Sequence, residues 1–355
     1  MENKTDIHLT PTIRLTLTSY AIALITIGTV SNSLLLFTII FRYKRRRVFM
    51  TRMKSLAEEL KRPPSATHLK QVNKSLTLAD ELLVLLTICD LFCLWILVLR
   101  HTVLLLTSYD IRIHSQLLCK IHTYASMVCS NLSTALLCIF SVQRTICIKW
   151  PLVSYTWFSR SRLNICLFVS LLLILLKHAP VFYFFNIYQK GNDYYCDFAL
   201  EDAHYFTIYY EFEFITHVII GYLLLAVANV CLCVFLRDKR PNHSSSGSSS
   251  TSCTCTQRSL RKGGHNTGRI VLLFSTFQLI TSVPFFVLIE LNQVFGMRLF
   301  PARYAITVFY FTILAVLTNN ALNYFLLLAI SKRFREDSAE FLVNVFSYIR
   351  VRCAP

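Results

Sequence analysis

Several polar residues of this sequence lie inside long apolar stretches, where burying their side chains is costly. Asp90 is the only carboxylate that we place well inside such a stretch, and Asn32, Asn319 and Asn323 lie in two others. A buried carboxylate needs hydrogen bonds or a bound cation. These four residues therefore predict a polar switch site, in which the amides offer the carboxylate alternative hydrogen-bond partners. The alternative is that the amides have no role in switching and only stabilise contacts between helices.

One carboxylate offers no acid–base pair, so these residues do not point to catalysis. The sequence also contains no H-E-x-x-H or G-x-S-x-G motif, and no cysteine–histidine group at metal-ligand spacing. Such motifs carry the residues that hydrolytic and metal chemistry needs. We therefore expect that the protein is not an enzyme and holds no metal centre of this kind.

The apolar stretches themselves are long enough to cross a membrane, which takes about 20 mostly apolar residues. Hydrophobic residues make up 54% of the 355 residues and charged residues only 15%, against roughly 25% charged in soluble domains. Seven stretches qualify: about 13–41, 78–106, 116–148, 161–187, 205–236, 268–294 and 300–330. The sequence therefore predicts an all-α membrane protein, with a seven-transmembrane helix bundle over residues 13–330.

The basic residues give these spans a direction. Most of the 36 Lys and Arg follow the first, third and fifth spans or lie in the tail, and the net charge is +17. Cytoplasmic loops carry such an excess. We therefore expect a multi-pass plasma-membrane protein with an extracellular N-terminus (1–12) and a glycosylation site at Asn3. Charge confined to short loops favours contact with membrane lipids over nucleic acid.

Three inner segments carry further information. The first inner loop (42–77) is long, and residues 54–61 predict a short helix within it. The third inner loop (237–267) contains a Ser-rich run at 244–254, which is typical of a flexible linker and a phosphorylation target.

Residues 331–355 predict an amphipathic helix on the inner leaflet, with Asp337 on its polar face, and a short cytoplasmic tail. Cys353 in that tail is either palmitoylated or a free thiol.

A series of residues recurs in a recognisable order along the whole chain. Its members are Asn32, Asp90, Cys119, Gln143-Arg144-Thr145, Pro151, Pro284, Asn319–Tyr324 and Ser331–Arg335, with 25 residues from Cys119 to Arg144. This series resembles the rhodopsin-like family of G-protein-coupled receptors. The resemblance implies a cell-surface receptor for an extracellular ligand that signals through heterotrimeric G proteins. It also implies arrestin and a receptor kinase as further partners.

The resemblance assigns roles to particular residues. Asp90 is similar to the sodium-site aspartate of the family, which implies Asn32 and Asn319 as its neighbours. Arg144 is similar to the arginine that contacts the G protein, with Gln143 and Pro151 beside it in the same region. Cys119 is similar to the family cysteine that pairs with the second outer loop, where Cys196 lies. Pro284 is expected to kink span six.

Departures from the family pattern mark a divergent member. Gln143 stands where the family has an acidic residue, and Ser282 stands where span six usually has tryptophan. Span seven reads N-Y-F-L-L from Asn323 where the family has N-P-x-x-Y, and span five has no proline. We therefore expect altered switching between resting and active states.

The resemblance to the family also limits the classes of ligand that the receptor is expected to bind. Ser126 stands where amine receptors carry an aspartate, and span seven contains no lysine for a retinal Schiff base, so amines and retinal are excluded. The second outer loop is acidic and aromatic, which suits a basic peptide, while Arg100 suits an acidic group of a ligand. The candidate cavity residues are Arg100, His101, Ser126, Phe285, Glu290 and Asn292.

A peptide is therefore the expected ligand. The segments Asn319–Tyr324 and Arg144–Pro151 look similar to invertebrate neuropeptide receptors of the FMRFamide-like kind. Two alternatives stay open: a chemosensory receptor for small molecules, which shares this architecture, and a multi-pass transporter. A transporter is expected to show internal repeats and broken helices near the midplane, and neither pattern is visible in the sequence.

Gln143 leads to a testable expectation. Since a neutral amide cannot form the usual carboxylate-to-arginine contact with Arg144, the resting state is less restrained and the wild-type receptor signals without ligand. Replacing Gln143 with Glu should lower this basal signal about threefold or more, within the range of a charge-assisted hydrogen bond. The measurement is ligand-free reporter activity at equal surface expression. A Gln143→Glu variant with wild-type basal activity contradicts the expectation.

Overall fold

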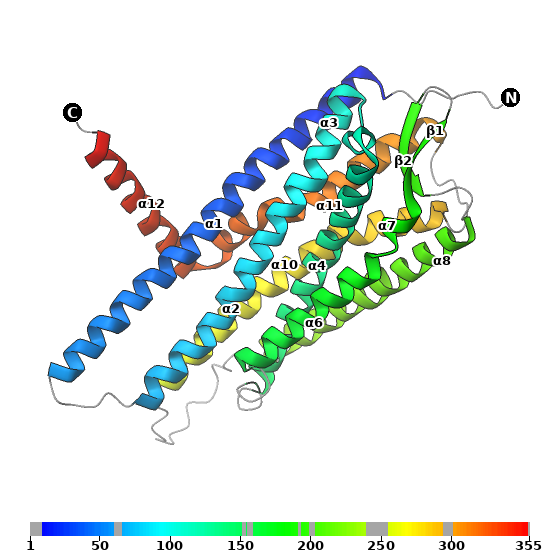
Figure 1. The fold of residues 1–355 in the computed structure, drawn as a ribbon. Coiled ribbons are helices and arrows are strands. Elements are labelled where there is room, and N and C mark those ends of the chain that lie inside the picture. The colour runs from blue at the N-terminus through cyan, green and yellow to red at the C-terminus, as the bar shows by residue number, and fades with distance from the viewer. Residues whose placement is uncertain are drawn as a thin grey trace.

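The computed structural model is a bundle of long helices that run side by side (Figure 1). It describes residues 9–59, 66–150, 154, 159–190, 193–198, 203–238, 255–293 and 301–353. Within these residues, seven helices are long and apolar enough to cross a membrane: Pro11–Arg45, Leu78–Thr107, Gln116–Lys149, Arg160–Phe184, Thr207–Arg237, Gly268–Leu288 and Tyr304–Ile330. The predicted seven-transmembrane bundle is confirmed.

Some spans are single helices and others are built from consecutive segments. Span one is α1 (Pro11–Glu59), span three α4 (Gln116–Lys149), span six α10 (Cys255–Gln293) and span seven α11 (Ala302–Ile330). Span two joins α2 (Ala66–Cys93), η1 (Leu94–Val98) and α3 (Leu99–Thr107). Span four joins α6 (Arg160–His178) and α7 (Val181–Phe184), and span five joins α8 (Ala203–Glu213), η4 (Phe214–Tyr222) and α9 (Leu223–Asp238).

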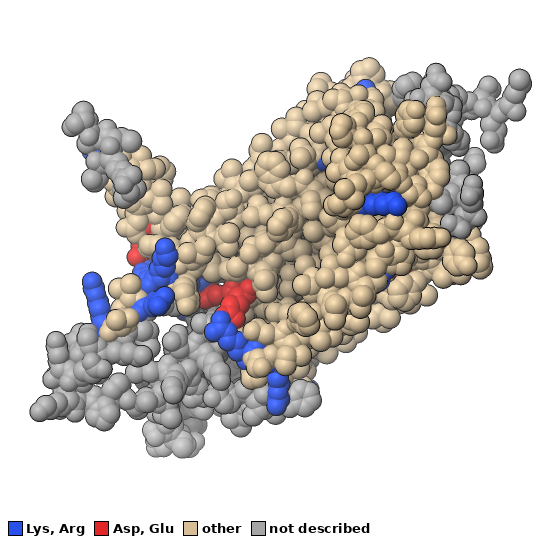
Figure 2. Space-filling view, viewed as in Figure 1, with Lys and Arg blue, Asp and Glu red and all other residues tan. Residues whose placement is uncertain are grey.

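Charged side chains mark one end of this bundle. They gather where α12 (Lys332–Cys353) leaves α11, while the visible side of the bundle is almost wholly uncharged (Figure 2). An uncharged belt between the two ends is what contact with hydrocarbon requires, because buried charge is costly there. The end that carries α12 is the one that the sequence predicts to be cytoplasmic.

The first inner segment differs from the prediction. Helix α1 continues beyond the membrane span to Glu59 without a break, so residues 54–59 do not form a separate helix. The reason is local, because residues 42–59 contain neither glycine nor proline to end the helix. Helix α2 begins at Ala66, and residues 60–65 lie outside the described part of the chain.

The second outer loop forms a β-hairpin that the sequence did not reveal. Strands β1 (Phe185–Lys190) and β2 (Asp193–Phe198) pair antiparallel, with Ile187 opposite Cys196. The base of the hairpin is held by a buried cluster, in which Phe185 and Phe198 pack with Val181 and Tyr209 from spans four and five. The hairpin therefore sits on the bundle as a rigid part of its outer end.

Two spans contain π-helical segments, η1 in span two and η4 in span five. A π-helical turn holds an extra residue, and such turns are frequent at functional sites. The extra residue rotates the side chains that follow the π-helical turn relative to the side chains that precede it. In span five this change begins directly after Glu213, in a span without proline.

Helix α12 is fixed to α1 at its beginning. Asp337 is buried and forms ion pairs with Arg42 Nε at 2.7 Å and with Arg45 Nη2 at 3.4 Å. The ring of Phe341 packs on Phe37 and Phe41. The prediction that placed Asp337 on an exposed polar face is wrong, since Arg42 and Arg45 of the long α1 reach over it. Farther along α12, Val345, Phe346 and Ile349 are exposed, as expected of an apolar face against lipid.

Gly28 allows α1 to approach its neighbours closely. A Cβ at Gly28 would lie 2.6 Å from Leu94 Cδ1 and 3.0 Å from Ala321 Cβ, whereas one at Gly221 would meet only ordinary contacts beyond 3.6 Å. Leu94 is fully buried, so its side chain would have to shift within the packed core. Gly28→Ala should therefore destabilise the protein by about 1–3 kcal/mol.

Gly221→Ala is the matched control, because alanine favours helix more than glycine does. It should leave the melting temperature of the detergent-solubilised protein unchanged or raise it. Equal melting temperatures for the two variants contradict the expected close contact at Gly28.

Candidate functional site

Asp90 lies at the centre of the bundle and is fully buried. Asn323 Nδ2 from α11 donates to Oδ2 of Asp90, and Ser133 Oγ from α4 donates to Oδ1 at 3.2 Å. The carboxylate thus joins spans two, three and seven. Ser133 was not singled out from the sequence, because a serine within a span has no distinguishing pattern.

Asn32 and Asn319 do not donate to Asp90, in contrast to the predicted arrangement. Asn32 Nδ2 donates to the carbonyl oxygens of Gly28 at 3.0 Å and Asn320 at 2.7 Å, which fixes α1 against α11. Asn319 Nδ2 donates to Gln278 Oε1 on α10 at 2.6 Å. Asn32 is therefore a packing residue, and Asn319 connects spans six and seven.

Tyr324, directly after Asn323, stands where the family motif has a proline, and it makes contacts at the inner end of the bundle. The hydroxyl of Tyr324 lies 2.6 Å from Ser338 Oγ on α12, and its ring packs edge-on against Phe334. Tyr324 thereby couples span seven to α12. This contact and the bond from Asn323 to Asp90 favour Asn323 as the first residue of the altered motif.

Arg144 lies at the inner end of α4 with its guanidinium buried. Its Cζ lies 5.5 Å from the ring centre of Phe140, while Nε and Nη2 have no hydrogen-bond partner among the described residues. Gln143 is also buried, and its Oε1 has no partner there either. The two neighbours therefore do not restrain each other. Pro151 lies outside the described residues.

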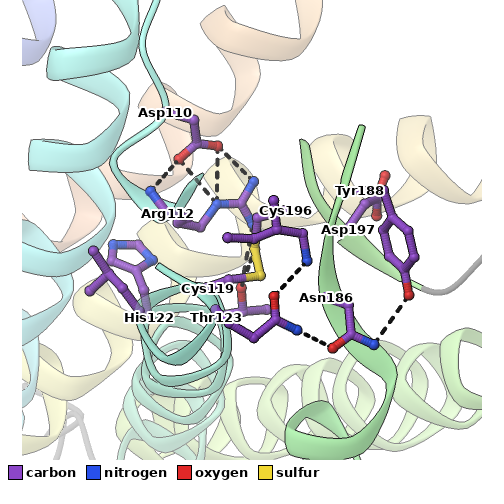
Figure 3. The surroundings of a disulfide bond; sticks show 12 residues. Asp110, Arg112, Cys119, His122, Thr123, Asn186, Tyr188, Cys196 and Asp197 are labelled. Carbon is purple, nitrogen blue, oxygen red and sulfur yellow. Dashed lines mark hydrogen bonds and ion pairs between the residues drawn. A yellow bond between two sulfur atoms is a disulfide. The ribbon is translucent and has the colours of Figure 1, made fainter. Parts of the chain in front are cut away.

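A disulfide ties the hairpin to the outer end of the bundle (Figure 3). It joins Cys119 near the start of α4 to Cys196 on β2. Gln116, one turn earlier on α4, donates to Asn186 Oδ1 and accepts from the backbone N–H of Ile187 at 3.0 Å. The hairpin is therefore fixed beside the outer ends of spans two and three.

The comparisons with known proteins agree with this geometry. A family described as "7 transmembrane receptor (rhodopsin family)" matches residues 67–326, which is more than half of the chain. The chain belongs to this family. A search of curated proteins gave no match. The protein is therefore a multi-pass receptor of the plasma membrane, and members of this family act as signalling receptors and not as enzymes.

At the outer end of the receptor, two arginines share one carboxylate. Arg100 Nη2 and Arg112 Nη2 lie 2.7 and 2.8 Å from Asp110 Oδ2, and Arg112 also contacts Thr123 beside the disulfide (Figure 3). Partial burial alone would raise the pKa of Asp110, but the hydrogen bonds from both guanidiniums hold it well below its ordinary value. This outer arginine cluster (Arg100, Asp110 and Arg112) has more positive than negative charge.

The remaining residues of the predicted cavity are spread over the outer half of the receptor. His101 is buried with its ring edge-on to Tyr310, and neither ring nitrogen has a partner among the described residues. Ser126 donates to the carbonyl oxygen of His122 at 2.7 Å. Phe285 packs on Phe286 and Phe309. Glu290 and Asn292 belong to α10, but their side chains lie outside the described part.

A second carboxylate lies inside the bundle, which corrects the prediction that Asp90 is alone. Glu213 at the end of α8 pairs with Lys177 Nζ of span four at 2.5 Å. Asn131 of span three bonds to both, donating to Glu213 at 2.8 Å and accepting from Lys177 at 2.9 Å. Glu213 was not singled out from the sequence, because it lies near the uncertain end of its apolar stretch.

Asp110 leads to a prediction about stability and pH. A carboxylate whose folded pKa is depressed stabilises the protein above its unfolded pKa of about 3.9, and this stabilisation is lost as the pH falls further. Asp110→Asn should therefore lower the stability at neutral pH, by about 1–3 kcal/mol for lost charged hydrogen bonds. The difference from wild type should shrink below about pH 4.

The measurement is the melting temperature of the purified receptor between pH 3.5 and pH 7. Glu211→Gln is the control, since this carboxylate is exposed on α8 and takes no part in the cluster. An Asp110→Asn deficit that is the same at every pH, or equal to that of Glu211→Gln, contradicts the assignment.

Proposed function

We propose that this receptor is activated by an extracellular peptide and signals through heterotrimeric G proteins. The observation that supports a peptide most directly is the outer arginine cluster beside the disulfide-tied hairpin. Two guanidiniums around one carboxylate leave a positive charge that an acidic side chain or a terminal carboxylate of a ligand can complete. Neuropeptides of the FMRFamide-like kind are one candidate class.

The hairpin supports the same proposal. Tyr194 and Tyr195 on β2 are half-exposed, and Asp197 on the same strand is exposed. Exposed aromatic residues are enriched where proteins bind other chains, and acidic residues beside them suit the basic groups of a peptide. A peptide can thus contact the acidic hairpin with its basic part and the outer arginine cluster with its acidic part.

Arg144 supports coupling to a G protein. Its buried guanidinium has donors without partners among the described residues, so a protein that enters the inner end can accept from them. Such a contact is favourable because an unpaired buried donor is costly. Arrestin and a receptor kinase remain proposed partners, with the Ser-rich run at 244–254 as the kinase target. This run and the proposed glycosylation site Asn3 lie outside the described residues.

Sodium at Asp90 belongs to the same proposal. Hard cations take oxygen ligands, and the Asp90 carboxylate and Ser133 Oγ provide them at one point of the bundle. We propose that these two oxygen groups hold a small cation, whose charge would offset the buried carboxylate.

A peptide-library screen in cells that express the receptor tests the proposal, read out with reporters for several G-protein classes. For an activating peptide, Arg100→Gln should raise the half-maximal concentration about tenfold, the cost of a lost charged hydrogen bond. Neutralising the acidic group of the peptide should weaken activation of the wild type but have little further effect on Arg100→Gln. This pattern is the signature of a direct pair.

Arg14→Gln is the control, because Arg14 also lies at the outer end but donates to Ser108 Oγ and to backbone oxygens of span two. It should keep the wild-type dependence on the acidic group. Activation by small molecules alone would favour the chemosensory alternative. Equal effects of peptide neutralisation on wild type and Arg100→Gln would contradict the proposed contact.

A further inference from the structure

The ion pair between Lys177 and Glu213 is not isolated but begins a series of hydrogen bonds across the bundle. His217 Nδ1, one turn after Glu213, lies 3.4 Å from Glu213 Oε1, and His217 Nε2 lies 3.4 Å from Thr134 Oγ1 of span three. Gln278 Nε2 of span six donates to the same Thr134 oxygen at 3.2 Å. The series ends at span seven, where Asn319 donates to Gln278.

The donors and acceptors of this series can all point the same way. If His217 donates from Nδ1 to Glu213, its Nε2 accepts from the hydroxyl of Thr134, which in turn accepts from Gln278. Every donor then points toward the negative charge of Glu213. Hydrogen bonds in such a chain strengthen one another in a medium of low dielectric constant. The ion pair at one end therefore affects the bond between Gln278 and Asn319 at the other.

The members of this relay, which we define as Lys177, Glu213, His217, Thr134, Gln278 and Asn319, are held firmly. His217, Thr134, Gln278 and Asn319 are each less than 7% exposed. The rings of His217 and Tyr222 pack on Phe286, so η4 and α10 are also joined by apolar contact. Three further titratable groups face the relay. The hydroxyl of Tyr222 hydrogen-bonds with Thr134 and Gln278. His178 lies with Nδ1 2.8 Å from the hydroxyl of Tyr209 and with Nε2 3.9 Å from Glu213.

Gln278 is the point where the relay crosses to spans six and seven. It lies six residues before Pro284 on the same helix, and Ser282 between them replaces a family tryptophan. A polar contact among spans three, five, six and seven therefore lies one helical turn from the position at which the family carries a bulky aromatic ring. Removing one partner of a buried ion pair leaves an uncompensated charge, which costs more than the pair itself contributes.

We infer that this relay couples the Lys177–Glu213 pair to span seven through Gln278 and restrains the receptor in its resting conformation. Breaking it at either end frees spans five and six to move apart from span three and raises basal signalling. The inference rests on the proposed signalling through G proteins for that consequence. Lys177, Glu213 and Gln278 are positioning residues in this scheme, since they act through the helices that they join.

Two single variants and their combination test the coupling. Lys177→Met removes the cation and Gln278→Leu removes the crossing point, each with a side chain of similar length or volume. Each should raise ligand-free signalling about fivefold, the low end of measured coupling between sites. The double variant should signal no more than the stronger single variant, because both changes break one relay.

Lys120→Met is the matched control, since Lys120 lies at the outer end of α4 and takes no part in the relay. It should leave basal signalling at the wild-type level. Should Lys177→Met fail to reach the cell surface, Glu213→Gln weakens the same pair at nearly constant volume, and Glu211→Gln, an exposed neighbour on α8, is its control.

Melting temperatures of the purified receptor separate this inference from the proposed function. Lys177→Met and Gln278→Leu should each lower the melting temperature, and their combined effect should be smaller than the sum. Additive effects in both measurements overturn the relay. Non-additive melting shifts, with no basal signal from the wild type or any variant in any reporter, support the relay and overturn signalling through G proteins.

Discussion

A polar side chain inside the hydrocarbon region must find its partners within the protein, because no water is available there. This constraint determines how the helices of the receptor meet. Asp90 gathers spans two, three and seven through Ser133 and Asn323. Glu213 gathers spans three, four and five through Asn131 and Lys177. Loss of a partner would leave either carboxylate buried and unpaired, which is destabilising. The two sites join spans two, three, four, five and seven, and the relay adds span six, so together they fix the relative positions of six helices.

Sequence reasoning succeeded where one residue type or a long composition pattern decides the outcome. The apolar stretches and the buried Asp90 belong to this group, and each is present in the structure. The bridge from Cys119 to Cys196, which the family resemblance implied, is present as well. Sequence reasoning failed where partners depend on how neighbouring helices are placed against one another. The amides of Asn32 and Asn319 have the right chemistry for Asp90, but Asn32 donates to the backbone of Asn320, and Asn319, one turn from Asn323, donates to Gln278. No single-sequence pattern reports which neighbour a buried amide meets.

The inner end shows how a divergent member compensates for missing family residues. Gln143 provides no carboxylate to Arg144, and the tyrosine of span seven lies directly after Asn323. In their place, Tyr324 reaches Ser338 of α12, and Asp337 next to it binds Arg42 on α1. The beginning of α12 is therefore held by spans one and seven together.

Span seven connects the two buried carboxylates. Asn319 takes part in the relay from Glu213, and Asn323 donates to Asp90. These residues are four apart on one continuous helix, so their side chains lie on the same face, one turn above the other. A rotation of α11 that withdraws Asn319 from Gln278 must also withdraw Asn323 from Asp90. A change that begins at the outer half of span five can therefore reach the centre of the bundle through Gln278 of span six and then through one continuous helix, α11.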